Sequence, residues 1–167
     1  MTTFNDKIKA FNKLYGLPVL DVPGVPFKDA IIDNTAQSAR KQLHQRLCKL
    51  QDILKEEVQE GSEICNMVNA GDEPVDVLTA LADWLGDMQV YCASEMAKFG
   101  LDNDMVLGII MASNMSKLGE DGQPIYDERG KVMKGPNYWK PEPQIKRYIQ
   151  AAWRQSLQDN AGEEDQP

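Results

Sequence analysis

The sequence predicts an all-α fold, a bundle of about five helices with a long loop or small hairpin near 119–140. Apolar residues recur at intervals of three and four over most of the chain, which is the spacing of one face of an α-helix. The segments without this spacing are short and rich in Gly, Pro, Asp and Asn, which end helices and form turns. A length of 167 residues fits one domain. We therefore expect a single all-α domain over 1–158 and a disordered acidic tail over 159–167.

The first half of the chain supplies two of these helices. Residues 3–16 keep the helical spacing and end at Gly16. The next segment, LPVLDVPGVPF, contains three prolines, so we expect an extended connector. From about Thr35 to Ala70 the apolar spacing continues without proline, which predicts one long helix that bends or is interrupted near Gly61.

The second half supplies three more helices and the long loop. Pro74 suits the first turn of a helix, and Asp102 suits the N-cap of the next one. Residues 119–140 lack the helical spacing, and within them an alternating segment predicts a hairpin that turns at Arg129-Gly130. The helices expected in this half cover about 74–99, 102–117 and 142–158.

The composition indicates a folded acidic protein. Hydrophobic residues make up 42% and charged residues 26%, which excludes disorder over the whole length. The net charge of −8 disfavours a nucleic-acid polymer as partner, because such binding needs a broad basic surface. A small anionic ligand would need a local cluster of Lys or Arg, or a metal ion.

Cysteine usage and hydropathy indicate a reduced, cytoplasmic protein. The three cysteines are far apart and lack CxxC spacing, which argues against disulfides and against a thiolate zinc site. The N-terminus has no uninterrupted apolar stretch, so we expect no signal peptide. The longest apolar run, Met105–Ala112, is too short to span a bilayer, so we expect no membrane contact.

A cluster of glutamates is the most informative feature of the long helix. At 100° per residue, its members fall within an arc of roughly 120° beside the apolar stripe. A solvated acidic face would point away from that stripe, and like charges one turn apart repel each other. The cluster consists of Glu56, Glu57, Glu60 and Glu63.

The following helix carries a second pair of carboxylates. Asp83 and Asp87 are four residues apart and share one face of the helix. Partly buried carboxylates persist only when they are paired or bound to cations. Two antiparallel helices that bring such oxygens together would suit Mg²⁺ or Mn²⁺. The alternative is a pair of ordinary solvated faces, whereas a di-iron site is excluded because His44 is the only histidine.

The long loop carries the local positive charge that an anionic ligand would need. Lys117 ends the preceding helix and further lysines follow in the loop. Lysine ammonium groups and asparagine amides suit phosphate oxygens, and Tyr138 or Trp139 could pack on a base. The alternative is a structural loop with solvated lysines. The loop lysines are Lys131, Lys134 and Lys140, and the amides belong to Asn114 and Asn137.

The acidic motif resembles that of the all-α nucleoside triphosphate pyrophosphohydrolases, which include MazG-like proteins, phosphoribosyl-ATP pyrophosphohydrolase and the dimeric dUTPases. The family pattern is EExxE on one helix and ExxD on the next. Glu56-Glu57-Val58-Gln59-Glu60 matches the first part in full. In the second part Trp84 stands three residues before Asp87, and the acidic residue is Asp83, four residues before it.

One branch of this superfamily is similar over about residues 10–141. The similar stretches are AFNKLYGLPVLDVP, DWLGDMQVYCASEMAKFGLD and SNMSKLGEDGQPIYDERGKVMKGPNYWKP, of which the last is the most specific. The resemblance implies hydrolysis of a nucleoside triphosphate or related nucleotide between its α and β phosphates, with release of pyrophosphate. It also implies a homodimer or a dimer of dimers.

The resemblance implies a role for each residue of the motifs. Glu57, Glu60 and Asp87 would bind Mg²⁺, with Asp83 as a further ligand. Glu56 would act as general base for the attacking water or would complete the metal shell. Asn114 and Lys117 would hold phosphates, and Asn137 and Tyr138 are the other candidates for contacting the substrate.

A protein of another class remains the alternative. It would be a non-catalytic helical protein that keeps the fold and uses its apolar faces for oligomerisation or interaction. The change at the ExxD position makes this conceivable, and the intact EExxE argues against it. Neither interpretation predicts which base or sugar the site prefers.

Overall fold

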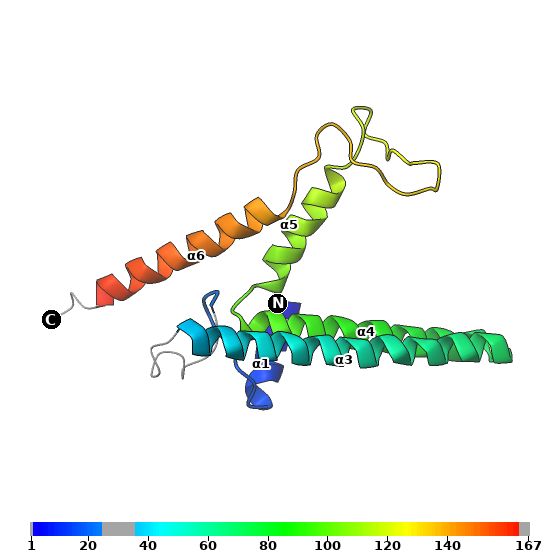
Figure 1. Cartoon of the computed structure of the whole chain (residues 1–167), viewed down its shortest axis with the longest axis horizontal. Coiled ribbons are helices and arrows are strands. Elements are labelled where there is room, and N and C mark those ends of the chain that lie inside the picture. The colour runs from blue at the N-terminus through cyan, green and yellow to red at the C-terminus, as the bar shows by residue number, and fades with distance from the viewer. Residues whose placement is uncertain (1, 25–35, 164–167) are drawn as a thin grey trace. The chain divides into compact units, whose positions relative to one another are not determined.

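The computed structural model describes residues 2–24 and 36–163, and confirms the all-α prediction. Five helices account for the regular structure of these residues, and the only β-pairing among them is a single bridge in the loop before the last helix. No helix in these ranges is both long enough and apolar enough to cross a membrane. The helices, shown in Figure 1, are α1 (Phe4–Leu14), α3 (Ala36–Ala70), α4 (Pro74–Lys98), α5 (Asn103–Met115) and α6 (Glu142–Glu163).

The chain divides into two compact units. The first comprises Met1–Leu20 and Gly24–Phe99, and so contains α1, α3 and α4. The second comprises Asp21–Pro23 and Gly100–Pro167, and so contains α5, the long loop and α6. Each unit has its own packing, and the two halves of the predicted site belong to different units.

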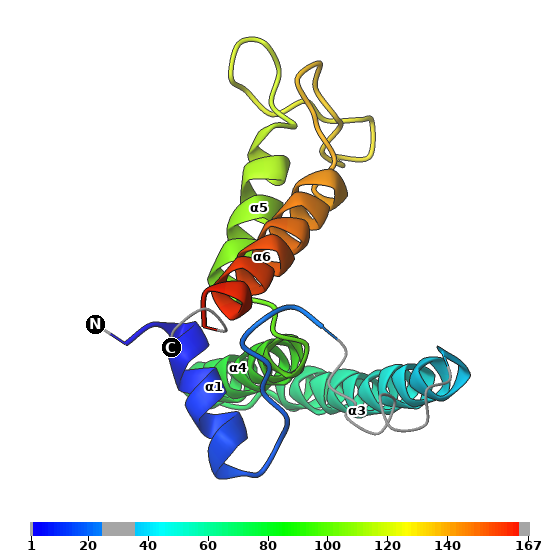
Figure 2. The same cartoon turned by 90° about the vertical axis from the view of Figure 1, so that its left-hand side faces the viewer.

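In the first unit, α3 and α4 pack against each other as an antiparallel pair (Figure 1), and Figure 2 shows the start of α3, in cyan, extending away from α4. The chain reverses between them at Gly71, whose φ of 81° lies in the left-handed region that favours glycine. The predicted break near Gly61 is absent, since α3 continues unbroken to Ala70. A glycine inside a helix costs stability but does not by itself end the helix.

Close packing fixes how α3 and α4 face each other. A Cβ atom at Gly61 would lie 2.8 Å from Cζ2 of the Trp84 ring, so only a glycine leaves room for the indole. The indole Nε1 donates a hydrogen bond of 2.6 Å to the main-chain oxygen of Glu57. Trp84 therefore points at α3, and the residues beside it on α4 point elsewhere.

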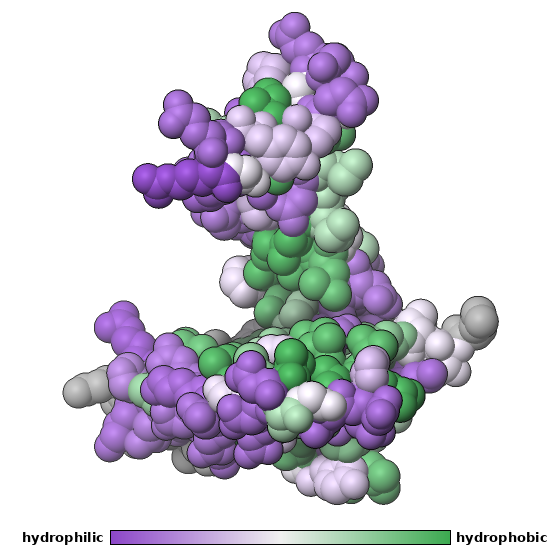
Figure 3. Space-filling view, turned by 90° about the vertical axis from the view of Figure 1, so that its right-hand side faces the viewer, coloured by the Kyte–Doolittle hydropathy of each residue, from purple (hydrophilic) through white to green (hydrophobic). Residues whose placement is uncertain are grey.

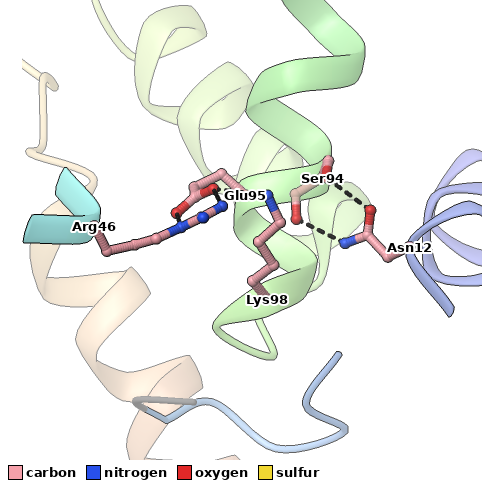
Figure 4. Close-up of polar contacts among 5 residues, drawn as sticks. All are labelled: Asn12, Arg46, Ser94, Glu95 and Lys98. Atoms are coloured by element: carbon pink, nitrogen blue, oxygen red, sulfur yellow. Dashed lines mark hydrogen bonds and ion pairs between the residues drawn. The ribbon is translucent and has the colours of Figure 1, made fainter. Parts of the chain in front are cut away.

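Helix α1 packs against the C-terminal half of α4 through a buried polar contact. Asn12 is fully buried, and its side-chain amide donates to the main-chain oxygen of Ser94 over 3.0 Å. The Ser94 hydroxyl donates in return to Asn12 Oδ1 over 2.7 Å (Figure 4). Around this contact lies a small apolar core of Ile8, Ala93 and Ala97.

A buried ionic group joins α3 to α4 at Glu95, the residue after Ser94. The guanidinium of Arg46 donates to both carboxylate oxygens of Glu95, and Lys98 Nζ donates to the same carboxylate over 3.0 Å (Figure 4). Burial alone would raise the pKa of Glu95, but the hydrogen bonds from Arg46 and Lys98 outweigh it and lower that pKa. Glu95 is therefore held as a carboxylate between two cations.

In the second unit, α5 begins at the predicted cap, where the Asp102 side chain accepts a hydrogen bond from the main-chain N–H of Met105. The main-chain N–H of Asp102 donates to the Tyr148 hydroxyl of α6 over 3.0 Å. Helix α6 runs to Glu163 rather than to 158, so most of the predicted tail is helical. The rest of that tail, 164–167, lies outside the described residues.

The loop between α5 and α6 contains the predicted hairpin. Tyr126 and Val132 form the antiparallel bridge, and Met133 donates its N–H to the oxygen of Ile125 over 2.7 Å. The turn uses Gly130 at a φ of 75°, as the Arg129-Gly130 pair predicts. The prediction of a small hairpin in this loop is confirmed.

Much apolar surface stays exposed in both units (Figure 3). Within the described residues, the buried hydrophobic side chains are only Ile8, Ala93, Ala97 and Val106. A helical chain of this length normally buries a larger core. Exposed large hydrophobic residues include Val58, Val68, Val75, Leu78 and Leu85 in the first unit, and Leu107, Met111, Met115 and Leu157 in the second.

Candidate functional site

The acidic site is built where α3 and α4 pack around Trp84. Glu57 lies on the apolar face of α3 that packs against α4, and only 7% of its surface is exposed. Its Oε2 atom is buried and has no hydrogen-bond partner among the described residues. A buried carboxylate oxygen without a partner is costly, so this atom is the first indication that something else binds here.

Neighbouring carboxylates surround Glu57 and act on one another. The charge of Glu57 is the largest of the influences that raise the pKa of Glu60, followed by slight burial and by further carboxylates. Those further carboxylates belong to Glu63, Asp87 and Glu56, in order of effect. The structure thus brings Glu56, Glu57, Glu60 and Asp87 of the predicted set into one electrostatic cluster.

Tyr91 is a member of the site that the sequence interpretation missed. The charge of Glu57 raises the pKa of the Tyr91 phenol, and burial and a hydrogen bond to the Glu57 carboxylate raise it further. Asp87 and Glu60 contribute to the same shift. The spacing contained the signal, because Tyr91 lies four residues after Asp87 and therefore on the same face of α4.

Asp83 lies apart from this cluster. Its side chain is exposed beside Asp76 and Thr79 on α4, and the leading charges that shift the pKa of Glu60 and of Tyr91 do not include it. The reason is rotational, since successive helical residues are 100° apart and it is Trp84 that points at α3. The structure therefore gathers Asp87 with the glutamates and leaves Asp83 outside.

The carboxylates of the acidic cluster have the right chemistry to bind a hard divalent cation. Their side chains, however, are not arranged as a coordination shell. Carboxylate oxygens are the ligands that Mg²⁺ and Mn²⁺ prefer. Over the described ranges, however, no three His, Cys, Asp or Glu side chains are grouped closely enough to hold an ion as they stand. The exposed side chains of Glu60 and Asp87 would have to turn toward the buried oxygen of Glu57.

The predicted phosphate-binding residues lie in the second unit, at the end of α5 and in the loop. Lys117 Nζ donates to Asn114 Oδ1 over 2.7 Å, so the ammonium and the amide are held side by side. Lys134 Nζ lies 4.6 Å from the centre of the Tyr138 ring, a cation–π contact. Asn137 is exposed on the same loop.

A close backbone approach holds the two ends of this loop together. Gly135 donates its N–H to the main-chain oxygen of Lys117 over 2.9 Å. A Cβ atom at Gly135 would overlap the main-chain oxygen of Leu118, which lies 2.1 Å from that position. Ser113 donates its hydroxyl to the main-chain oxygen of Trp139, so the loop also returns to α5. Lys117 and Tyr138 are consequently fixed within one small assembly.

The chain was compared with protein-family models, curated proteins and solved structures. No protein-family model matches the chain, and no curated protein matches it in sequence. Among solved structures, the chain is similar to a "putative NTP pyrophosphohydrolase" from Exiguobacterium sp. 255-15. The TM-score is 0.45 and the identity 22%, over 96% of this chain and 99% of the other.

Proposed function

We propose that this protein is a nucleotide pyrophosphohydrolase that uses Mg²⁺ to cleave a nucleoside triphosphate, or a related nucleotide, between its α and β phosphates. The observation that carries the proposal is the buried Glu57 carboxylate, with an unpartnered oxygen and like charges around it. Such an arrangement is unfavourable alone and becomes favourable when a cation binds. The match to the EExxE motif of the all-α pyrophosphohydrolases supports the same proposal.

The residues that would hold the cation are Glu57, Glu60 and Asp87, with Asp83 as the outermost candidate. A bound Mg²⁺, or Mn²⁺ in its place, would neutralise charge on the phosphates and lower the pKa of the attacking water. Tyr91 interacts with Glu57, whose charge raises the pKa of the phenol, and its hydroxyl would orient that carboxylate. The exposed side chain of Glu56 is the candidate general base.

The candidate residues for contacting the substrate belong to the second unit. Lys117 and Asn114 are paired donors suited to phosphate oxygens, and Asn137 adds a further amide. Tyr138, with Lys134 over its ring, presents a flat aromatic face. We propose that the enzyme works as a homodimer or a dimer of dimers, because the exposed apolar faces of both units need a partner.

Release of pyrophosphate from a panel of nucleoside triphosphates with Mg²⁺ tests the proposal directly. We expect Glu57→Gln and Glu60→Gln to lower turnover about a hundredfold or more, because charge stabilisation by a metal is worth several kcal/mol. Glu73→Gln is the matched control, since Glu73 is an exposed glutamate at the start of α4 with no side-chain cap hydrogen bond. Wild-type turnover in both cluster variants would refute the metal assignment.

The alternative function, a non-catalytic helical protein that assembles through its apolar faces, is favoured by one observation. The exposed hydrophobic residues of both units would suit a partner whether or not the protein is an enzyme. A stable oligomer that releases no pyrophosphate from any nucleotide, with Mg²⁺ or Mn²⁺, would decide for this alternative.

A further inference from the structure

The first unit contains a cavity that adjoins the acidic cluster and extends away from it. It measures about 550 Å³ and lies among α1, α3 and α4. This volume falls within the range of small-molecule sites, about 300–1,000 Å³. We propose that it binds the base and sugar of the substrate nucleotide, and that Lys49 contacts a carbonyl oxygen on the edge of the base. The inference rests on the proposed function, which leaves the choice of nucleotide open.

The cavity is joined to the acidic cluster through α4. Asp87 belongs to the cluster and also lines the cavity, as does Tyr91 one turn later. Ser94 and Lys98 continue the same lining, so the four residues form one stripe along α4 with spacings of four, three and four. From Asp87 to Lys98 is 11 residues, or about 16 Å at 1.5 Å per residue. A nucleotide with its phosphates near Asp87 therefore has room for its nucleoside along this stripe.

Aromatic and aliphatic side chains form the wall of the cavity. Phe11 and Tyr15 come from α1, and their ring centres are 4.5 Å apart at an interplanar angle of 39°. Ile53 and Val90 add apolar surface from the other two helices. Stacking on aromatic rings is the usual way to bind a flat nucleobase without reading its sequence of donors and acceptors. This wall fits the base better than it fits the charged phosphates.

The polar groups that line the cavity determine which hydrogen-bonding groups a bound base must have. Arg46 and Lys98 are both engaged by the Glu95 carboxylate, and the Ser94 hydroxyl donates to Asn12. Lys49 also lines the cavity, is exposed, and makes no ion pair within the described part of the chain. A lysine can only donate hydrogen bonds, so its partner must be an acceptor. An exocyclic carbonyl oxygen is the stronger acceptor for an ammonium group, and guanine, cytosine and uracil have one, whereas adenine offers only ring nitrogens.

Paired variants of the full chain test the two parts of the proposal. We expect Phe11→Ala to weaken binding of nucleoside 5′-monophosphates about five- to hundredfold in metal-free titration calorimetry, which is the effect of losing one stacking partner. Leu14→Ala is the control, because Leu14 lies on the same helix, is 82% exposed and does not line the cavity. Tyr15→Ala, at a residue that is 67% exposed, repeats the test should Phe11→Ala disturb the fold.

The lysine is tested by selectivity rather than by affinity alone. Lys49→Met should weaken binding of guanosine, cytidine and uridine 5′-monophosphates about tenfold more than that of adenosine 5′-monophosphate, as loss of a charge-assisted hydrogen bond predicts. Lys55→Met is the control, since Lys55 lies on the same helix but pairs with Asp52 outside the cavity. Equal losses for all four ligands would overturn the role of Lys49.

Binding and hydrolysis separate this proposal from the proposed function. If the wild type hydrolyses triphosphates and the Phe11, Tyr15 and Lys49 variants keep its KM for every base, the cavity assignment is wrong and the enzymatic function stands. If no triphosphate is hydrolysed but monophosphates bind in a manner that depends on Phe11, the enzymatic function is wrong and the cavity assignment stands.

Discussion

Glu57 combines two properties that rarely occur together in a stable helix pair. Its carboxylate is buried, and one of its oxygens has no hydrogen-bond partner in the described ranges. Tyr91 satisfies part of the carboxylate, while Glu60 and Asp87 add negative charge beside it. At the scale of single residues, the site is therefore arranged at the expense of the stability of the ion-free protein.

The pH dependence of stability should reveal this expense. The neighbouring carboxylates raise the pKa of Glu60 in the folded state. The Glu60 carboxyl therefore stabilises the folded state below its pKa in the unfolded state, about 4.5, and this stabilisation is lost as the pH rises through the pKa of the folded state. Glu95 has a lowered pKa and behaves in the opposite sense, so its contribution is present above about 4.5 and is lost as the pH falls through the folded pKa.

Glu60→Gln isolates the first of these effects. The variant should be more stable than the wild type at about pH 7 in the presence of a chelator, and the difference should shrink toward about pH 4. Urea unfolding at both pH values measures it, and added Mg²⁺ should narrow the difference at neutral pH by stabilising the wild type alone. A difference that does not change with pH would contradict the electrostatic account of the cluster.

At the scale of elements, the contact between Gly61 and Trp84 sets the rotation of α3 against α4. Gly61→Ala should lower the free energy of unfolding by about 1–3 kcal/mol, because the new methyl group overlaps a ring held by its hydrogen bond to Glu57. Gly86→Ala is the matched control, since that position in α4 has nothing within 4 Å of the added Cβ. The control should gain about 0.5–1 kcal/mol from helix propensity. Chemical denaturation of both variants measures the contrast, and a stabilised Gly61→Ala protein would show that the helices do not meet as described.

The assembly of Lys117 and the loop offers a second test at this scale. Lys117→Ala should weaken nucleotide binding about ten- to hundredfold, since a charge-assisted contact is worth roughly 1.5–3 kcal/mol. It should leave Mg²⁺ binding to the nucleotide-free protein unchanged, because the carboxylates belong to the other unit. Calorimetric titration with each ligand separately measures both quantities, with Lys146→Ala as the control, since Lys146 is an exposed lysine of α6.

Proteolysis checks whether the loop responds to the metal-bound nucleotide. Residues 119–140 should resist cleavage when nucleotide and Mg²⁺ are present together, because a triphosphate without metal is repelled by carboxylates. Equal protection with and without Mg²⁺ would show that the loop and the acidic cluster bind their ligands independently.

At the scale of the whole molecule, the exposed apolar side chains predict an oligomer. The described residues bury only four hydrophobic side chains, while Leu14, Val75, Leu78 and Leu157 are each more than 60% exposed. We expect sedimentation to give a species of at least twice the chain mass of 18.8 kDa. Leu78→Glu should shift the distribution toward smaller species if the exposed face of α4 forms the contact between subunits. Leu14→Glu tests the exposed face of α1 in the same way. A stable monomer at micromolar concentration would contradict this prediction.

The sequence by itself determined most of the local structure. The bounds of α1, α3, α4 and α5 follow from apolar spacing, caps and turn residues, and the hairpin follows from its alternating pattern and Gly130. It also placed Glu56, Glu57 and Glu60 on one helix and Asp87 on the next, and their role as a site stays a prediction. These features depend on residues within a few turns of one another, so local rules suffice to predict them.

Only the tertiary structure decided which side chains the helices turn toward each other. The sequence spacing places Asp83 and Asp87 on the same face of the helix. The packing of Trp84 against Gly61 fixes the rotation of α4, so that Asp87 lies in the cluster and Asp83 lies outside it. The cavity depends in the same way on α1 reaching α4 from 82 residues away, through Asn12 and Ser94. Such contacts depend on shape and packing between distant segments, and no periodicity within one segment contains that information.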